Sequence, residues 1–235
     1  TATTRQAWQR GFNSSGWIKN GHQEKFEMVT AESFATMLRL DYKFGKHKHT
    51  YAGMSAYIGD SSANRPKEDM KENAYVTMFE GHFTYNEFPL RVYSTGIYGN
   101  LENSNIVSQK NANLSNNLGV KRTPVGKNAV GFTTEIGYEV LHHFSNLKHH
   151  MLYPFLRYDY YDSMYDVEGS IVDNPRWQRS AITGGINWFI AQEVTIKAQY
   201  TNRRLGSQNY DLNTLLYTGK KQIENTFSIG IGFEF

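Results

Sequence analysis

The chain has 235 residues, with 25 Lys and Arg against 22 Asp and Glu, and a formal net charge of +3 at pH 7. So small a positive excess argues against nucleic acid as a partner. The absence of cysteine excludes a disulfide framework, and no run of about eighteen apolar residues exists that would predict a transmembrane helix. Aromatic residues are plentiful (16 Tyr, 14 Phe and 4 Trp), which suits rings lying at a membrane interface.

The first thirty residues predict no regular element. Residues 1–5 are not followed by an apolar core, so no secretory signal peptide is expected, and we expect a mature chain or a fragment. From Phe34 onward, apolar and polar residues alternate strictly. Successive side chains of a β-strand point to opposite faces, so this alternation predicts strands with one apolar and one polar face.

The alternation predicts nine or ten strands. Nine of them can be delimited, at residues 34–44, 51–58, 75–85, 90–98, 130–140, 152–160, 177–189, 194–203 and 227–235. In the first, Leu38, Leu40 and Tyr42 lie on one face, and Arg39 and Asp41 lie on the other. Charged side chains at this density do not fit a dry core, so the polar face is expected to contact water.

The connections alternate in length. Those expected to be short are 45–49, 86–89, 142–150 and 190–193, and those expected to be long are 59–73, 100–128, 162–175 and 205–221. Outer-membrane barrels have short periplasmic turns and long extracellular loops, whereas a soluble β-sandwich, the alternative for any single strand, has no reason to do so. The sequence therefore predicts an all-β fold, a transmembrane antiparallel β-barrel in one domain (1–235), surrounded by the lipid of a bacterial outer membrane.

The final stretch ends on an aromatic residue. Phe227, Ile229, Ile231, Phe233 and Phe235 fall on one face of a strand, with small or charged residues on the other. This pattern resembles the closing strand of bacterial outer-membrane barrels, in which the terminal aromatic belongs to the signal read by the insertion machinery. The resemblance implies that Phe233 and Phe235 form that signal and that the insertion machinery is a partner.

The polar faces are predicted to line a water-filled lumen. The predicted pore-lining residues are Arg39, Lys43, Arg91, Arg157, Arg179, Lys197 and Arg203, with Asp41, Glu80, Glu135, Glu139, Asp159 and Glu234. The slight basic excess favours anions. The alternative is that these residues form cross-strand ion pairs that brace the wall and have no part in selectivity.

Two groups of residues were considered for chemistry. Six histidines fall in two of the short connections, at positions His47, His49, His142, His143, His149 and His150. No acidic or cysteine partner has metal-ligand spacing around them, so solvated side chains and no metal are expected. Glu80 and His82 share a face, but no nucleophile accompanies them, so they are interpreted as wall residues. No enzymatic activity and no cofactor are predicted.

Several segments, in order along the chain, resemble the later part of the phosphate-selective porins of Gram-negative bacteria. They are residues 12–18 (FNSSGWI), 38–42 (LRLDY), 57–60 (YIGD), 80–82 (EGH), 154–158 (PFLRY) and 230–235 (GIGFEF). The resemblance implies a sixteen-stranded homotrimeric channel for small anions. Only nine or ten strands are present, so we expect the carboxy-terminal part of a larger porin, with a smaller complete barrel as the alternative. The family's anion-binding basic residues do not match positions here one by one.

The function predicted from the sequence is therefore passive diffusion of small hydrophilic solutes, anionic or neutral, with a slight preference for anions such as phosphate. One rival is a structural barrel that is closed by its loops and binds a partner protein, for which the long loop 100–128 is the main support. Another is a barrel lipase or protease, for which no nucleophile or acid–base cluster is found at the predicted extracellular rim.

Overall fold

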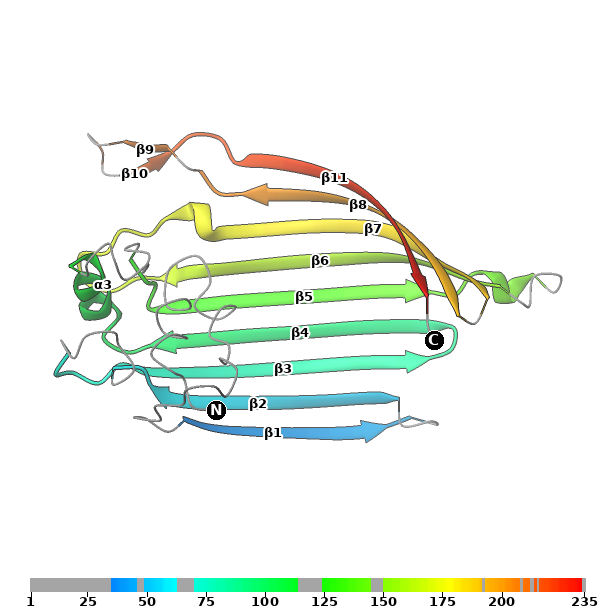
Figure 1. The fold of residues 1–235 in the computed structure, drawn as a ribbon, viewed down its shortest axis with the longest axis horizontal. Helices are drawn as coiled ribbons and strands as arrows, with labels where there is room; N and C mark the ends of the chain where they lie inside the picture. The colour runs from blue at the N-terminus through cyan, green and yellow to red at the C-terminus, as the bar shows by residue number, and fades with distance from the viewer. Residues whose placement is uncertain are drawn as a thin grey trace.

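The structure is a computed structural model that describes residues 35–45, 49–62, 70–113, 124–144, 150–191, 193–207, 209–211, 214 and 216–233. Most of these residues belong to one antiparallel sheet of nine strands in the order β1-β2-β3-β4-β5-β6-β7-β8-β11 (Figure 1). The strands are β1 (Ala35–Phe44), β2 (Thr50–Asp60), β3 (Tyr75–Glu87), β4 (Leu90–Leu101), β5 (Asn128–Tyr138), β6 (Met151–Asp166), β7 (Gln178–Ala191), β8 (Val194–Leu205) and β11 (Gln222–Phe233).

All nine delimited strands are confirmed, together with the predicted face of those residues that lie within the observed strands. Directly paired residues of neighbouring strands lie on the same face. The pairing register joins Leu38 to Ala56 and Ala56 to Phe79, and it joins Asp41 to Gly53 and Gly53 to His82. The alternation of each strand therefore continues coherently across the sheet. We call the face that carries Arg39, Asp41, Glu80, His82, Glu135, Arg157, Asp159 and Arg203 the charged face, and the opposite one the apolar face.

Some elements were not predicted. The region 100–128, expected to be a loop, contains helix α3 (Ser104–Ala112). A small separate hairpin, β9 (Asn209–Asp211) with β10 (Leu216–Thr218), interrupts the last long connection. Two single-turn 3-10 helices, η2 (Leu141–His143) and η4 (Pro175–Trp177), lie between strands. No helix among the described residues is long and apolar enough to span a membrane.

The connection lengths match the prediction at all but one place. The β1–β2, β3–β4 and β7–β8 connections are short, and they lie at the end of the sheet where β11 finishes beside the start of β8. The β5–β6 connection, 139–150, is about as long as the β6–β7 connection at the opposite end, 167–177, because β6 extends to Asp166. The alternation of short and long connections is therefore incomplete. We call the end near β11's last residue the turn end, and the other the long-loop end.

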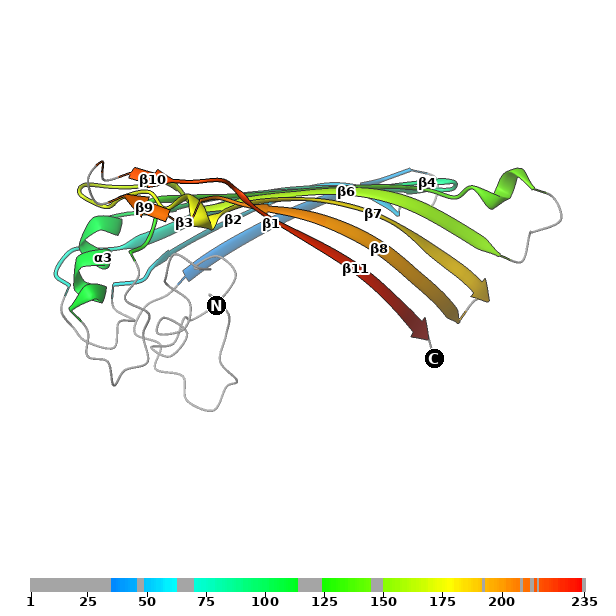
Figure 2. The same ribbon diagram turned by 90° about the horizontal axis from the view of Figure 1, so that it is seen from above.

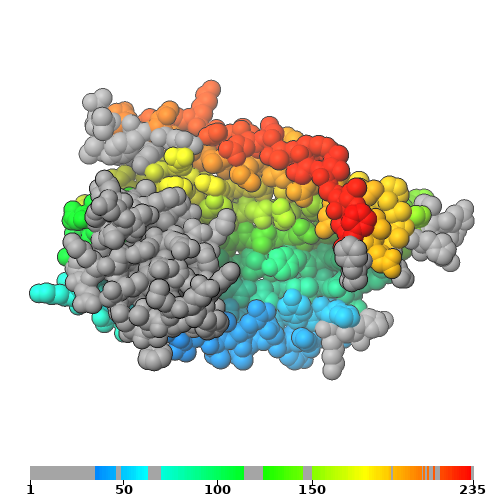
Figure 3. All heavy atoms as spheres, in the orientation of Figure 1, coloured from blue at the N-terminus to red at the C-terminus, as the bar shows by residue number. Residues whose placement is uncertain are grey.

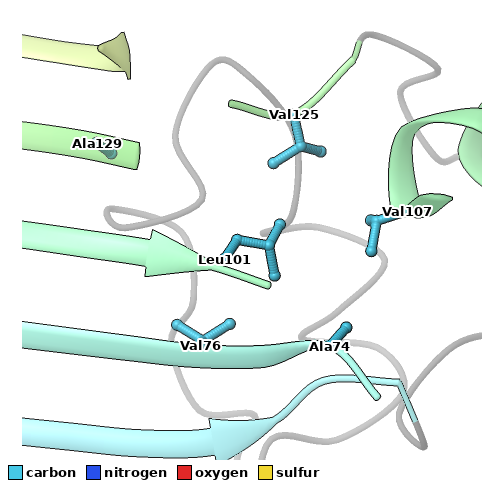
Figure 4. Close-up of a cluster of buried hydrophobic side chains, with 6 residues drawn as sticks. All are labelled: Ala74, Val76, Leu101, Val107, Val125 and Ala129. Atoms are coloured by element: carbon cyan, nitrogen blue, oxygen red, sulfur yellow. The ribbon is translucent and has the colours of Figure 1, made fainter. Parts of the chain in front are cut away.

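The charged face is the concave side of the sheet. Val76, Leu101 and Ala129 lie at charged-face positions near the long-loop end, and Val107 of α3 packs against them (Figure 4). Figure 2 shows α3 on the side toward which β8 and β11 curve. Figure 3 views this side, with the middle strands lying behind the end of β11. The sheet therefore curves around its charged residues, with a small core under α3 at one end.

The sheet is not closed. β1 and β11 occupy opposite edges, and neither forms a second pairing with another strand that the structure describes. The all-β antiparallel fold is thus confirmed, whereas closure into a barrel and insertion into a membrane stay predictions.

Candidate pore-lining face

A network of charged residues joins the first three strands on the charged face. The register places Asp41 and His82 on either side of Gly53, and Glu80 one step along β3 on the same face. Arg39 Nε donates to Asp41 Oδ2 over 2.8 Å, and His82 Nε2 lies 2.6 Å from Asp41 Oδ1. His82 Nδ1 lies 2.9 Å from Glu80 Oε1. The imidazole therefore lies between two carboxylates, with only 6% of its side chain exposed.

Neighbouring hydroxyl groups complete this network. Ser55 Oγ donates to Glu80 Oε2 over 2.7 Å, and Thr95 Oγ1 donates to Glu80 Oε1 over 2.9 Å. These donors come from β2 and β4, so the carboxylate of Glu80 links three strands of the sheet. Such bonds to an ionised acceptor are stronger than those between neutral groups. The network holds the side chains on this part of the charged face in place.

Gly53 makes the contact between Asp41 and His82 possible. It pairs with both residues in the register and therefore lies directly between them. A Cβ atom added at Gly53 would lie less than 3.0 Å from side-chain atoms of both Asp41 and His82. The missing side chain leaves the space in which the carboxylate and the imidazole meet. Neither single-strand periodicity nor composition identifies this role, because it depends on the register of three strands.

A second ion-paired group lies on β5 and β6. Arg157 Nε donates to Asp159 Oδ2 over 3.1 Å, and Arg157 Nη1 lies 3.8 Å from Glu135 Oε2 on the neighbouring strand. Thr133 Oγ1 donates to Asp159 Oδ1 over 2.6 Å. These side chains are about one-third exposed. Arg157 therefore pairs with Asp159 within β6 and with Glu135 across to β5, so one of these two ion pairs is of the predicted cross-strand kind.

The basic residues of β7 and β8 are less fully paired. Arg203 lies 3.4 Å from Glu224 of β11, with about half of its side chain exposed. The Arg179 guanidinium lies over the Tyr161 ring, 5.5 Å from its centroid, and its buried Nε has no hydrogen-bond partner among the described residues. A cavity of about 400 Å³ lies beside Arg179, Arg203 and Asp159. Two guanidinium groups therefore border one space on this part of the sheet.

The remaining predicted basic residues are separate from these groups. The Arg91 guanidinium lies 4.3 Å from the centroid of the Tyr153 ring. Lys43 and Lys197 are exposed, and neither forms an ion pair or hydrogen bond with another residue that the structure describes. Within the described part of the charged face, most carboxylates thus have a side-chain partner, whereas Lys43 and Lys197 have none.

The prediction that Glu139 lines the pore was wrong. β5 ends at Tyr138, and Glu139 is buried in the following turn, where its carboxylate accepts hydrogen bonds from the backbone N–H groups of Leu141, His142 and Leu152 at 2.8, 2.7 and 3.2 Å. Burial opposes ionisation, but these three donors hold the pKa of Glu139 below its ordinary value. Glu139 organises the β5–β6 connection instead of facing a lumen.

The carboxy-terminal prediction is described only in part. Phe233 pairs with Val194 and is exposed on the apolar face, while Glu234 and Phe235 lie outside the described residues. The role of the terminal aromatics in insertion stays a prediction.

Among the histidines of the short connections that the structure describes, His142 lies beside an acidic group. His142 Nδ1 is 3.3 Å from Glu139 Oε2, and its ring is in contact with that of His143. Within the described ranges, no group of three or more His, Asp and Glu residues is arranged to hold a metal ion. His47 and His149 lie outside those ranges.

The charged side chains of this face do not gather at one point among the described residues. The charged groups are spread along the sheet as ion pairs, and His82 has carboxylates at both ring nitrogens with no hydroxyl nucleophile within hydrogen-bonding distance of it among the residues described. Comparison of the chain with protein-family models, curated proteins and solved structures gave no match.

Proposed function

We propose that the protein is an outer-membrane channel that passes small hydrophilic solutes by diffusion along its charged face. The observation that carries this proposal is the opposite character of the two faces. The concave face holds charged residues, and the other exposes large apolar side chains with no described element over them. Lipid outside and water inside would satisfy both faces.

The apolar face is difficult to reconcile with water. Its exposed side chains extend from β1 to β11 and include Leu38, Leu40, Met54, Phe79, Phe132, Ile136, Leu156, Ile182, Ile186, Phe227, Ile229 and Ile231. Monomeric soluble proteins rarely expose contiguous apolar patches larger than about several hundred Å². A lipid environment removes this cost and makes the same residues stabilising.

The charged face supports a water-filled space and, within it, a preference for anions. Asp41 and Asp159 each lie beside an arginine that offsets their charge, whereas the hydroxyl groups around Glu80 stabilise its carboxylate without neutralising it. Lys43 and Lys197 have no acidic partner among the described residues, so the excess charge in the lumen would be positive. This distribution supports the predicted anion preference and gives it specific residues.

A membrane location requires that both sheet edges be paired. Each backbone N–H or C=O left unsatisfied in hydrocarbon costs several kcal/mol. β1 and β11 each have one edge without a strand partner in the described part of the chain. We propose that further strands complete the barrel, as the resemblance to sixteen-stranded trimeric porins implies.

Planar-bilayer recording tests the channel. Purified, correctly inserted protein should give discrete ion-conductance steps, and an inserted protein without current would overturn the proposal. Reversal potentials in a salt gradient should indicate anion preference. In the variant Lys43→Glu/Lys197→Glu, the preference should shift toward cations, because two positive charges are replaced by two negative ones and the net charge of the lumen falls by four units. Glu193→Lys, an exposed turn position outside the strands, is the control and should change selectivity less.

One observation favours the rival in which loops close the barrel and a partner protein binds there. Helix α3 packs against charged-face residues at the long-loop end, so it lies over one end of the proposed lumen. Replacing 104–112 by a flexible linker of equal length should raise conductance if α3 narrows an open channel. Absence of current before and after the replacement would favour the closed barrel.

A further inference from the structure

A polar site lies on the apolar face, where the channel does not use it. Near the long-loop end of β6, β7 and β8 (Figure 1), a cavity of about 190 Å³ is lined by side chains of Tyr158, Tyr160, Gln178, Ser180, Arg204 and Lys221. The register pairs Tyr160 with Ser180 and Ser180 with Arg204, so these three residues share one face. That face also carries Ile182, which makes it the apolar one.

The side chains around this cavity are rich in hydrogen-bond donors. Arg204 and Lys221 are exposed, and no carboxylate of the described residues lies within 4.0 Å of their charged nitrogens. Gln178 Nε2 donates to Tyr160 Oη over 3.2 Å, which leaves the phenol hydrogen to donate elsewhere. Two cations with nearby hydroxyl groups form a set of groups that binds a phosphate oxygen well.

The cavity lies where the apolar face becomes polar. One row nearer the turn end, Tyr158 pairs with Ile182, Ile182 with Asn202, and Asn202 with Asn225. The Asn202 amide donates to Asn225 Oδ1 over 2.7 Å. Nearer still to the turn end, this face carries apolar residues that include Leu156, Ile186 and Ile229. In a barrel within lipid, tyrosines and cations at such a boundary lie at the level of the headgroups.

We propose that this cavity binds the phosphate of a lipid headgroup, with the acyl chains of that lipid lying along the apolar face. The inference rests on the proposed membrane function, since only then is lipid present at this face. A lipid fits better than free phosphate because the cavity opens beside exposed apolar side chains, including Leu156 and Ile182, which acyl chains would cover. The phosphate contacts Arg204 and Lys221, and Tyr160 and Ser180 donate hydrogen bonds.

Native mass spectrometry of the full chain released from detergent micelles tests this site. The probes are dioleoyl phosphatidic acid and dioleoyl phosphatidylcholine, which share acyl chains and differ in headgroup. The wild type should retain phosphatidic acid in preference. A surface cation contributes about fivefold to the binding of anionic lipid, so Arg204→Gln/Lys221→Gln should weaken retention roughly thirty-fold. The control Lys43→Gln/Lys197→Gln removes two cations from the charged face and should retain the lipid as the wild type does.

Three results would overturn the proposal: equal retention of the two lipids by the wild type, unchanged retention by Arg204→Gln/Lys221→Gln, or displacement of the lipid by millimolar inorganic phosphate. The third would assign the cavity to a free anion. Planar-bilayer recording of the same preparations separates this outcome from a failure of the channel. A conducting protein without lipid selectivity refutes the lipid site alone, whereas a protein without current refutes the channel.

Discussion

Substituting Ile229 by Arg tests directly whether the apolar face contacts lipid. Ile229 pairs with Ala198, and along the face it lies between Trp188 near the turn end and Asn202 near the long-loop end. It is therefore close to the middle of the apolar band. The adjacent residue Ser228 pairs with Gln199 on the charged face and is also exposed. Ser228→Arg is thus a matched control: it introduces the same side chain in the same strand on the other face.

The expected cost follows from the exposure of Ile229. An Arg at the bilayer midplane costs about 2–4 kcal/mol in a barrel. Ile229 is 68% exposed, so in lipid it contributes roughly 1–2 kcal/mol of the about 1.5–3 kcal/mol that a fully buried side chain provides. Ile229→Arg should therefore lower the free energy of unfolding of the membrane-inserted protein by about 3–6 kcal/mol. Ser228→Arg, which faces water, should change it by about 0.5 kcal/mol or less.

Reversible folding of the full chain into phospholipid vesicles, followed by tryptophan fluorescence over a denaturant series, measures both values. If the two Arg variants agree to within about 0.5 kcal/mol, the apolar face does not contact lipid and the reasoning fails.

Glu139→Ala should lower the free energy of unfolding by about 3 kcal/mol, because three backbone N–H groups lose their acceptor. The control Glu193→Ala, in an exposed turn at the same end of the sheet, should change the free energy of unfolding little in the same denaturant series. The pKa of Glu139 is lowered in the folded state, so its contribution is complete above about pH 4.3 and is lost as the pH falls through the lowered pKa. The difference between wild type and Glu139→Ala should therefore shrink only in that acidic range, and a constant difference down to pH 2 would contradict this account. Gly53→Ala should destabilise the sheet by about 1–3 kcal/mol through overpacking against His82, while Gly81→Ala, where a Cβ meets nothing within 4 Å, should be tolerated; equal denaturation midpoints would refute the role given to Gly53.

The strands and their faces could be predicted from the sequence because the two sides of each strand have opposite requirements. Leu38, Leu40 and Tyr42 alternate with Arg39 and Asp41 over the whole of β1, and a shift of one residue would reverse every side chain. The alternation of apolar and polar residues can therefore be recognised in each strand without reference to the others. Strand ends were less accurate, as at β6, where the alternation weakens near Asp162 although pairing continues.

Helix α3 could not be predicted, because its own sequence gives little indication of a helix. Its nine residues, SNIVSQKNA, have no apolar stripe, and Asn and Ser are poor helix formers. Tertiary contacts supply what propensity does not. Val107 packs against Leu101 and Val125, and Ser108 Oγ accepts a bond from the Val125 N–H over 2.9 Å. These partners lie on other elements, so no local pattern reports them.

The roles within the candidate site depended on register and turn geometry. Parity correctly placed Glu80 and His82 on one face, but only the pairing of three strands brings His82 between two carboxylates. For Glu139, parity failed because the strand had already ended and the backbone no longer alternated. Periodicity therefore assigns a side chain to a face while the strand continues, and it carries no information about partners.

The order of the strands also determines how the sheet is assembled. Each strand hydrogen-bonds to the strands before and after it in the chain, with only the β9–β10 hairpin set aside between β8 and β11. Pairing can therefore proceed hairpin by hairpin from either end, and each step closes only one connection. Loop-closure entropy rises with loop length, so the 102–127 connection opposes the joining of β4 to β5 more than any other connection opposes its own pair. Folding of α3 onto Leu101 and Val125 shortens the effective length of that connection. It thereby favours the pairing of β4 with β5, which joins strands β1–β4 to the strands that follow.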